Sequence, residues 1–220
     1  MESLDMLANN IANSETAGFK ADREFYNLYQ QQLPVIESHW TDFTQGSLLP
    51  TGNPLNAALS GKGFFVVQGP DGPVYTRGGT FQILKNNQLA TAEGYPVRDV
   101  RREGQPIAVD PTQTISIDKA GVVTQAGQVV GQMEIARMPT AAEAVRKLGH
   151  SYFAMLERGV PAPTGETEVL QGQLEQSNVT VADSAVRLVS VMRQFEMLQK
   201  AMNIGAQMNR EAIQEVAKVG

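Results

Sequence analysis

The sequence contains no cysteine, which excludes disulfide bonds, thiol nucleophiles and zinc or iron–sulfur sites held by thiolates. Histidine is nearly as scarce: His39 and His150 are the only two, and neither stands at metal-ligand spacing with the other or with acidic residues. No apolar run reaches the length of a membrane-spanning helix. We therefore expect no metal site, no cofactor and no insertion into a membrane.

Clusters of positive charge are also missing. The 18 Lys and Arg residues are scattered, the net charge is −5, and Arg101-Arg102 is interpreted as a charged turn. This distribution disfavours nucleic acid as a partner. The N-terminus carries Glu2 and Asp5 where a secretory signal peptide would have a basic region and then an apolar core. We expect a cytoplasmic protein, or one exported without a cleaved signal peptide by a route that reads another signal.

Motifs of catalysis are absent as well. Gly61-Lys62-Gly63 lacks the spacing of a phosphate-binding loop and precedes an expected strand instead of a helix. Ser60 and Ser151 have no nucleophile-elbow context. Glu166 and Glu168 could be the carboxylate pair of a hydrolase, but they lie in a polar stretch where solvation is expected. The sequence predicts no enzyme.

Apolar residues make up 42% and charged residues 19% of the 220 positions, which is typical of one or two globular domains. The most informative stretch is 180–219, where Thr180 is an N-cap residue and the following pattern predicts one helix. Such a helix would be roughly 57 Å long. Its apolar residues form two stripes on opposite faces, so both faces need a covering partner. The first stripe comprises Val181, Ala185, Leu188, Met192, Phe195, Leu198, Met202, Gly205 and Ile213, and the second comprises Val186, Met197, Ala201, Ile204 and Met208.

A short apolar stripe at the N-terminus predicts a second helix that ends near Asn13. At about 12 residues and roughly 18 Å, it covers less than half of the C-terminal helix. Either other copies of the chain supply the missing surface, or residues precede Met1. The stripe consists of Leu4, Leu7, Ala8 and Ile11, and Asn9, Asn10 and Asn13 suit the end of a helix, either as plain capping residues or with a further role in assembly.

The middle of the chain predicts β-structure, beginning with a hairpin of 63–68 and 74–77. Short runs bounded by turns, without alternating helices, favour an antiparallel sheet or an open barrel. Further strands are expected at 81–84, 88–91, 95–99, 107–110, 114–118, 122–125, 129–137 (the longest), 152–156 and 168–174. A short helical or irregular connector is expected at 19–40, an extended loop at 41–62, and a short helix or loop at 140–148.

The order of elements predicts an α+β protein. Termini that bracket a domain are often close together, so the N- and C-terminal helices are expected to pair as a stalk around a mainly antiparallel β-rich middle domain. The expected divisions are the N-terminal helix at 1–18, a connector at 19–62, the β-rich domain at 63–175 and the long helix at 176–220.

Three motifs, in order along the chain, resemble those of the flagellar basal-body rod and hook proteins. Residues 8–20 (ANNIANSETAGFK) resemble the N-terminal signature of that family. Residues 60–67 (SGKGFFVV) and 75–81 (YTRGGTF) resemble its central segment, and residues 171–179 (QGQLEQSNV) resemble the segment before its C-terminal helix. The resemblance covers the chain nearly from end to end.

The resemblance implies an axial structural protein of the bacterial flagellum. Such a protein is exported unfolded through the flagellar type III apparatus and polymerises helically into the basal-body rod that crosses the periplasm. Its partners would be other copies of itself, other rod subunits and the export machinery. Residues 192–197 (MRQFEM) are closer to the proximal-rod type than to the distal-rod type. The family normally carries further helical residues before the Asn-rich signature, so Met1 is a candidate internal methionine.

Sixteen residues are expected to make assembly contacts, because two opposite apolar stripes suit a polymer in which one surface meets a different surface on the next copy. They are Leu4, Leu7, Asn9, Asn10, Ile11 and Asn13 in the first helix, and Val181, Ala185, Leu188, Met192, Phe195, Met197, Leu198, Met202, Ile204 and Met208 in the last.

Three alternatives remain at this point: a distal-rod or hook-type axial protein, a soluble adaptor whose long helix docks one partner helix, and an enzyme acting on peptidoglycan. An adaptor should be a monomer or dimer with ordered terminal helices. An isolated rod subunit should leave those helices mobile until neighbours cover them.

Overall fold

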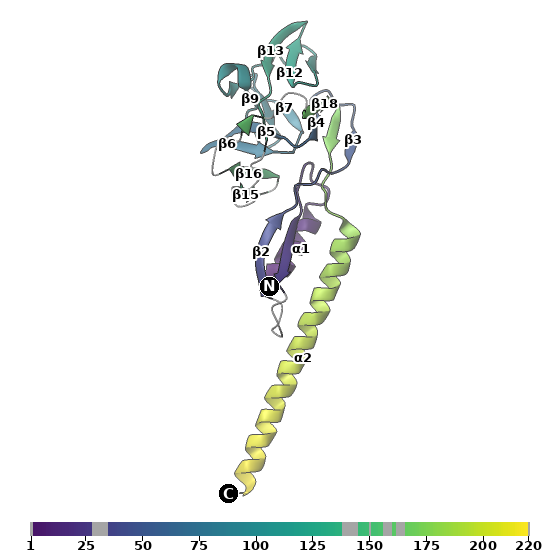
Figure 1. Ribbon diagram of the computed structural model, residues 1–220, viewed down its shortest axis with the longest axis vertical. Coiled ribbons are helices and arrows are strands. Elements are labelled where there is room, and N and C mark those ends of the chain that lie inside the picture. Colours follow the sequence, from purple (N-terminus) through teal and green to yellow (C-terminus); the bar gives the residue numbers. More distant parts are fainter. Residues whose placement is uncertain are drawn as a thin grey trace. The chain divides into compact units, whose positions relative to one another are not determined.

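The structure is a computed structural model and describes residues 2–27, 35–137, 145–149, 151–155, 160–161 and 166–219 (Figure 1). The chain divides into two compact units. We call Met1–Ala12 together with Thr180–Gly220 the terminal unit, and Asn13–Val179 the β unit.

The terminal unit contains the two predicted helices. Helix α1 spans Glu2–Ala12 and α2 spans Val181–Val219, so the predicted ends near Asn13 and Thr180 are confirmed. The backbone N–H of Ser184 donates to the carbonyl of Thr180 at 3.0 Å, which closes the first turn of α2. The two helices contact each other. Leu7 of α1 is buried.

Helix α2 keeps most of its apolar side chains in solvent. Phe195 is 46% exposed and Met202 is 67% exposed, although each belongs to an apolar stripe. Within 181–210, where the structure describes the side chains of α2, Ser184 is the only buried residue. The chain by itself therefore leaves both predicted faces of α2 largely uncovered. The exposed large apolar residues are Val181, Val186, Val189, Met192, Phe195, Met197, Leu198, Met202, Ile204 and Met208.

The β unit is built around an antiparallel sheet with the strand order β15-β16-β6-β5-β14-β17. Its centre is the predicted hairpin, in which apolar β-branched and aromatic residues favour strands. The bounds are β5 Phe64–Gly69, β6 Gly72–Thr76, β14 Ile135–Arg137, β15 Val145–Gly149, β16 Tyr152–Met155 and β17 Val160–Pro161.

Smaller antiparallel sheets surround this sheet. One has three strands, β11 (Ile115–Ile117), β12 (Val122–Gln125) and β13 (Gln128–Gln132). The others are pairs: β1 (Asp22–Asn27) with β2 (Val35–Thr41), β3 (Leu48–Pro50) with β19 (Gln173–Glu175), β4 (Ala57–Gly61) with β18 (Thr167–Gln171), β7 (Phe81–Ile83) with β8 (Leu89–Thr91), and β9 (Arg98–Asp99) with β10 (Gln105–Pro106). A 3-10 turn, η1 (Val100–Arg102), follows β9. The α+β class is therefore confirmed.

The core of the β unit consists of two buried clusters, one on each face of the hairpin. Phe65 and Val67 belong to the larger cluster, whereas Phe64 and Val66 belong to the smaller, as expected when successive residues of a strand point to opposite faces. In the smaller cluster, the rings of Phe64 and Phe153 meet edge to face at 5.8 Å.

Two expectations for the segment before the hairpin were wrong. Residues 19–40 were expected to be helical or irregular, but 22–27 and 35–41 pair as β1 and β2. The expected loop 41–62 contains β3 and β4. Strands β1 and β2 pair with each other, and that pairing decides their conformation. The partners of β3 and β4 lie more than 100 residues later in the sequence, so short local patterns do not contain the information that decides the conformation of these two strands.

Three expectations about strands also need correction. The run 129–137 is split between β13 and β14. The backbone carbonyl of Glu134 accepts a hydrogen bond from the N–H of Val66, and the N–H of Glu134 donates to the carbonyl of Arg98. At this residue the chain therefore passes from one sheet to another. The run 168–174 is split at Gly172, whose φ of +75° lies in the left-handed region. Residues 107–110 form only an isolated bridge, through Ala108.

Of the segment 140–148, the described part 145–149 is strand β15, and the rest lies outside the described residues.

Candidate functional site

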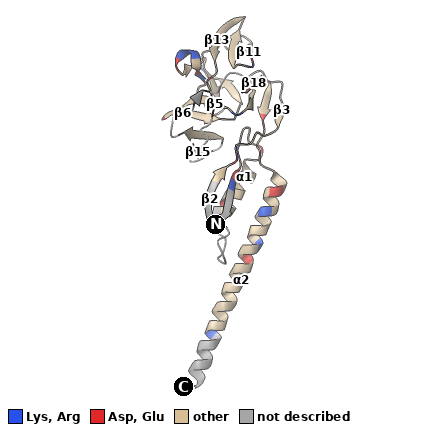
Figure 2. Cartoon of the chain, viewed as in Figure 1, with Lys and Arg blue, Asp and Glu red and all other residues tan. Residues whose placement is uncertain are grey.

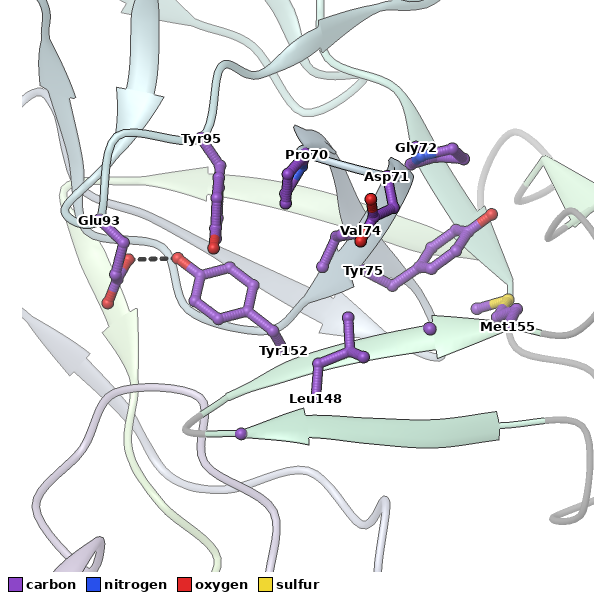
Figure 3. A pocket seen from close by; sticks show the side chains of 13 residues that line it. Pro70, Asp71, Gly72, Val74, Tyr75, Glu93, Tyr95, Leu148, Tyr152 and Met155 are labelled. Carbon is purple, nitrogen blue, oxygen red and sulfur yellow. Dashed lines mark hydrogen bonds between the residues drawn. The ribbon is translucent and has the colours of Figure 1, made fainter.

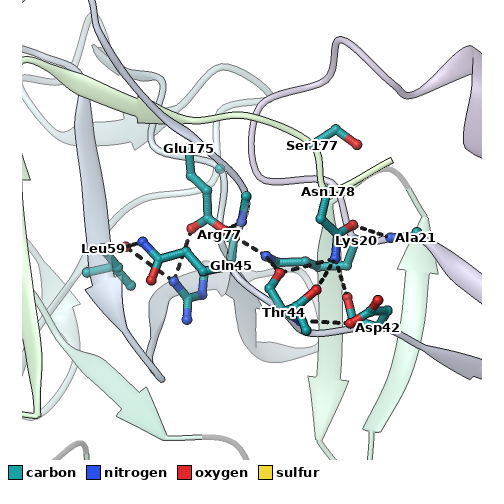
Figure 4. Close-up of polar contacts among 12 residues, drawn as sticks. Lys20, Ala21, Asp42, Thr44, Gln45, Leu59, Arg77, Glu175, Ser177 and Asn178 are labelled. Carbon is teal, nitrogen blue, oxygen red and sulfur yellow. Dashed lines mark hydrogen bonds and ion pairs between the residues drawn. The ribbon is translucent and has the colours of Figure 1, made fainter. Parts of the chain in front are cut away.

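Three segments that are distant in the sequence meet at one place in the β unit, which we call the junction. They are residues 18–21, the end of β6 with Arg77, and β19 with residues 176–178 (Figure 4). The N–H of Gly18 donates to the carbonyl of Glu175 at 2.8 Å. The N–H of Asn178 donates to the carbonyl of Phe19 at 3.4 Å. The residues that follow α1 are thus bound to those that precede α2.

Glu175 is the central acid of the junction and is fully buried. Its Oε1 accepts from the Lys20 ammonium at 2.6 Å and from the Gly46 N–H at 3.0 Å. Its Oε2 accepts from Arg77 at 3.0 Å. Backbone carbonyls complete the shell: Lys20 also donates to Thr44 at 2.6 Å, and Arg77 also donates to the carbonyls of Leu59 and Gly61.

Two buried cations share this one carboxylate. Burial lowers the pKa of Lys20 from its ordinary value, and attraction to Glu175 opposes the shift. Burial likewise lowers the pKa of Arg77, whose guanidinium also lies 5.0 Å from the centre of the Phe64 ring. Charges removed from water are tolerated only when they are paired and hydrogen-bonded. The triad of Lys20, Arg77 and Glu175 therefore depends on all three members.

Asn178 extends the junction towards β1 and β2. Its side-chain oxygen accepts from the N–H of Ala21 at 2.8 Å, and its amide group donates to the carbonyls of Asp42 at 2.7 Å and Thr44 at 3.1 Å. Asp42 in turn accepts from Arg23 at 2.7 Å. One amide side chain thus ties the segment before α2 to the residues just before β1 and just after β2.

Gly18 allows the first segment to approach this closely. Its φ of +70° lies in the left-handed region, and a Cβ at this position would overlap the backbone of Arg77 and Gly78. Position 18 therefore requires glycine for two reasons: the left-handed backbone conformation and the lack of room for a Cβ.

The junction holds chain segments together and is not a site for chemistry. Its ionised groups are buried and paired with one another, so they offer no open position to a substrate. Among the described residues, no cluster of three histidine, aspartate or glutamate side chains could hold a metal ion. No described helix has the length and apolar character needed to cross a membrane.

The residues predicted to make assembly contacts lie elsewhere, on α1 and α2, except for Asn13, which directly follows α1. In α1, Leu7 and Asn10 are buried, whereas Asn9 is exposed. Asn13 accepts a hydrogen bond from the hydroxyl of Thr16 at 3.3 Å, in keeping with a role at the end of the helix. Helix α2 carries the other ten, of which Leu188 is half-buried and the remainder are exposed: Val181, Ala185, Met192, Phe195, Met197, Leu198, Met202, Ile204 and Met208. Their role in assembly remains a prediction.

The local sequence around Lys20, Arg77, Glu175 and Asn178 does not show that these four residues meet. Each lies within one of the three motifs quoted above, so membership of a motif was the available signal. Burial of a charged residue cannot be read from its neighbours in the sequence, because lysine, arginine and glutamate are ordinarily exposed.

The β unit also carries a pocket of about 680 Å³ beside β6 and β16 (Figure 3). Its lining includes Tyr75, Tyr95 and Tyr152, and the rings of the last two meet edge to face at 5.2 Å. The hydroxyl of Tyr152 donates to Glu93. Burial, together with this bond, raises the pKa of Tyr152 above its ordinary value, so the phenol stays protonated as the donor at neutral pH.

Three family models match the chain. The model described as "Flagella basal body rod protein" matches residues 2–20, "Flagellar hook protein FlgE/F/G D1 domain" matches residues 58–125, and "Flagellar basal body rod FlgEFG protein C-terminal" matches residues 170–215. Lys20, Arg77 and Glu175 fall one in each matched stretch. The junction therefore joins the three regions by which the chain is recognised.

The chain is also similar over nearly its whole length to curated proteins. It is 32% identical to "Flagellar basal-body rod protein FlgF" of Caulobacter vibrioides, over 98% of this chain and 92% of that protein. It is 33% identical to the protein of the same name from Mesorhizobium japonicum, over 96% and 90%. It is 28% identical to "Flagellar basal-body rod protein FlgG" of Buchnera aphidicola subsp. Schizaphis graminum, over 94% and 91%.

Proposed function

The chain belongs to the flagellar basal-body rod protein family, and we propose that it is a structural subunit of the rod that polymerises through its terminal helices. The proposed type is the proximal rod. The relatives named FlgF match at 28–33% identity and those named FlgG at 27–30%, and the two relatives above 30% are both named FlgF, which supports this type over the distal-rod type.

The uncovered surface of α2 is the observation that carries the proposal. Large apolar side chains on two faces of the helix stand in solvent, and Met202 and Met208 are each more than 60% exposed. Charged residues are sparse along α2, and the stretch from Ala201 to Asn209 carries none (Figure 2). Contiguous exposed apolar surface marks a site of protein association. Two opposite faces suit contacts with two different neighbours, as a helical polymer requires.

The proposed arrangement pairs α1 with the first part of α2 as a stalk. The supporting geometry is the junction, which holds Gly18 and Phe19 against Glu175 and Asn178, so that the chain segments leading to both helices start from one place. Helix α1 has 11 residues and α2 has 39, so α1 as described can cover only a part of α2. The proposed partners are other copies of the chain and other rod subunits.

The proposed location is the basal body of the bacterial flagellum, in the rod that crosses the periplasm. The proposed route there is export through the flagellar type III apparatus, which handles unfolded chains. Absence of cysteine agrees with a polymer whose contacts are entirely non-covalent.

The proposal is tested by placing a charge on the apolar faces of α2. We expect Leu188→Asp, Phe195→Asp and Met202→Asp each to block incorporation into the rod. Burial of an uncharged polar group without a hydrogen bond costs roughly 2–7 kcal/mol, and burial of an unpaired carboxylate costs more. Basal bodies isolated from a strain that lacks the native subunit would be probed for the variant protein, together with swimming motility. The β unit should unfold at an unchanged denaturant concentration in all three.

The matched control is Gln207→Asp, which makes the same charge change at an exposed polar position of the same helix, roughly 80° from either stripe at about 100° per residue. It should assemble. Normal rods from all three apolar-to-Asp variants would rule out the proposed role of α2.

A further inference from the structure

The pocket beside β6 and β16 has an anionic and aromatic lining. Asp71 and Glu93 contribute carboxylates, and no lysine or arginine lines the pocket. Both acids are exposed, and within the described part of the chain neither is paired with a cation. Carboxylates beside tyrosine rings form a site for a flat cation, because a guanidinium can stack on a ring while its N–H groups bind the acids.

The acidic side chain of Glu93 is held in place before any ligand arrives. Tyr152 donates its hydroxyl proton to Oε2 of Glu93, and the ring of Tyr152 is itself held against Tyr95 (Figure 3). Within the described part of the chain, Oε1 of Glu93 accepts no hydrogen bond, which leaves an acceptor for an incoming N–H group. Leu148, which is 51% exposed, adds an apolar surface at the pocket.

A complementary surface lies on the same β unit, at the turn η1. Val100 is 45% exposed, and Arg101 is exposed with no ion pair for its guanidinium among the described residues. The buried Asp99 fixes this turn: its Oδ1 accepts from the N–H of Arg101 at 2.9 Å and from the N–H of Gln132 at 3.0 Å. An exposed apolar side chain and a free cation are thus presented on a rigid base.

We propose that Arg101 of one copy of the chain binds in this pocket on a second copy, with its guanidinium between Asp71 and Glu93 and with Val100 packed on Leu148. The turn offers one cation and one apolar side chain, and the pocket offers two acids and one apolar side chain. Because the turn and the pocket are different surfaces of one unit, the contact is heterologous and can be repeated from copy to copy. It joins β units, and so it is a contact separate from the proposed polymerisation through α2.

The contact is tested by cross-linking, because the natural chain has no cysteine and each introduced one reports alone. Full-length chains carrying Arg102→Cys and Pro70→Cys, which place the cysteines next to the contact and keep Arg101, Asp71 and Glu93, are mixed in equal amounts under mild oxidation. A disulfide requires Cα atoms within about 7 Å, so it forms efficiently only if the two sites meet. Both chains also carry Phe195→Asp, which removes association through α2 and keeps the outcome independent of the proposed function.

The mixture should give several-fold more of the mixed dimer than Pro70→Cys mixed with Lys85→Cys, a control at an exposed turn outside the pocket. Millimolar free arginine should lower that yield by competing for the acids. A yield equal to the control overturns the proposal and leaves a sister subunit or a small cation as the ligand of the pocket. A yield that free arginine does not change overturns it too, because the chains would then meet without using the pocket.

A charge exchange gives a second measurement. Arg101→Glu alone and Asp71→Lys alone should each reduce self-association in sedimentation of the Phe195→Asp chain at high concentration. The double variant, which restores opposite charges across the contact, should recover it. Failure of the double variant to recover association, with each single variant folded, also overturns the proposal.

Discussion

Glu175 shows how far a single residue can determine this fold. It is a buried acid between two buried cations, and its partners Lys20 and Arg77 lie 155 and 98 residues away in the sequence. The net contribution of such a group is modest, because desolvation offsets the attraction between the charges. Loss of one member is costly, because it leaves the others buried without a counter-charge.

We therefore expect Glu175→Gln to lower the free energy of unfolding by about 3–5 kcal/mol, as when one partner of a buried ion pair is removed. Glu168→Gln is the matched control, since Glu168 pairs with Lys119 at 3.1 Å while their side chains are 46% and 74% exposed. Its cost should be about 0–1 kcal/mol. Urea unfolding followed by tryptophan fluorescence and circular dichroism measures both, and equal costs would contradict the structural role given to the triad.

Asp42 predicts a dependence on pH. Burial by itself would raise the pKa of Asp42, but hydrogen bonds from Thr44 and Arg23 outweigh it, and the pKa lies below the ordinary 3.8. A folded-state pKa below the unfolded one means that the ionised group stabilises the protein above pH 3.8, and that this stability is lost as the pH falls through the folded value.

The stability difference between the natural chain and Asp42→Asn should therefore be largest near neutral pH and should shrink as the pH falls from about 6 to about 3. Urea titrations at several pH values would measure it. A difference that stays constant over this range would mean that ionised Asp42 contributes nothing to the fold.

At the scale of elements, the approach of the segment 13–21 to β6 sets the geometry of the junction. Gly18 and Gly52 provide a matched pair, because their φ values are +70° and +69°, but only Gly18 has backbone atoms where a Cβ would lie. Replacement by alanine costs about 1–2 kcal/mol at either position for the left-handed conformation. Gly18→Ala should cost about 1–3 kcal/mol more, because the segment must move away from Arg77.

The difference between the two glycine variants is measured by thermal or urea unfolding of each. Equal destabilisation would show that the segment moves freely and that the close approach is not part of the stable fold.

At the scale of the whole molecule, the two units differ in how much of their apolar surface the chain covers. Leu59, Phe65 and Leu89 of the β unit are fully buried, whereas Phe195 and Met202 of α2 stand in solvent. Local stability follows burial, so regions with few buried apolar contacts open at low free energy. The structure therefore predicts one stable unit and one helix that depends on neighbours.

In a dilute sample of the isolated subunit, amide hydrogens of 190–210 should exchange at least about tenfold faster than those of β5 and β6, since each 1.4 kcal/mol of opening free energy corresponds to a factor of ten. Hydrogen–deuterium exchange with mass spectrometry measures this. On assembly into rods the same amides should become protected. Strong protection of 190–210 in the isolated subunit would favour the adaptor hypothesis.

The sequence by itself determined the α+β class, the limits of both helices and the two apolar stripes of α2. These features are local: capping residues, positions three and four apart, and turn residues between short apolar runs all lie within a few residues of one another. The family resemblance was also visible in three contiguous motifs.

Only the tertiary structure decided the rest. It paired 48–50 with 173–175, split 129–137 between two sheets, and brought Lys20, Arg77 and Glu175 together. It also formed the acidic pocket from the turn at 70–73, the loop at 93–95 and the strands around Tyr152. The physical reason is the same throughout, because pairing and burial depend on partners far away in the chain, which the pattern of neighbouring residues does not encode.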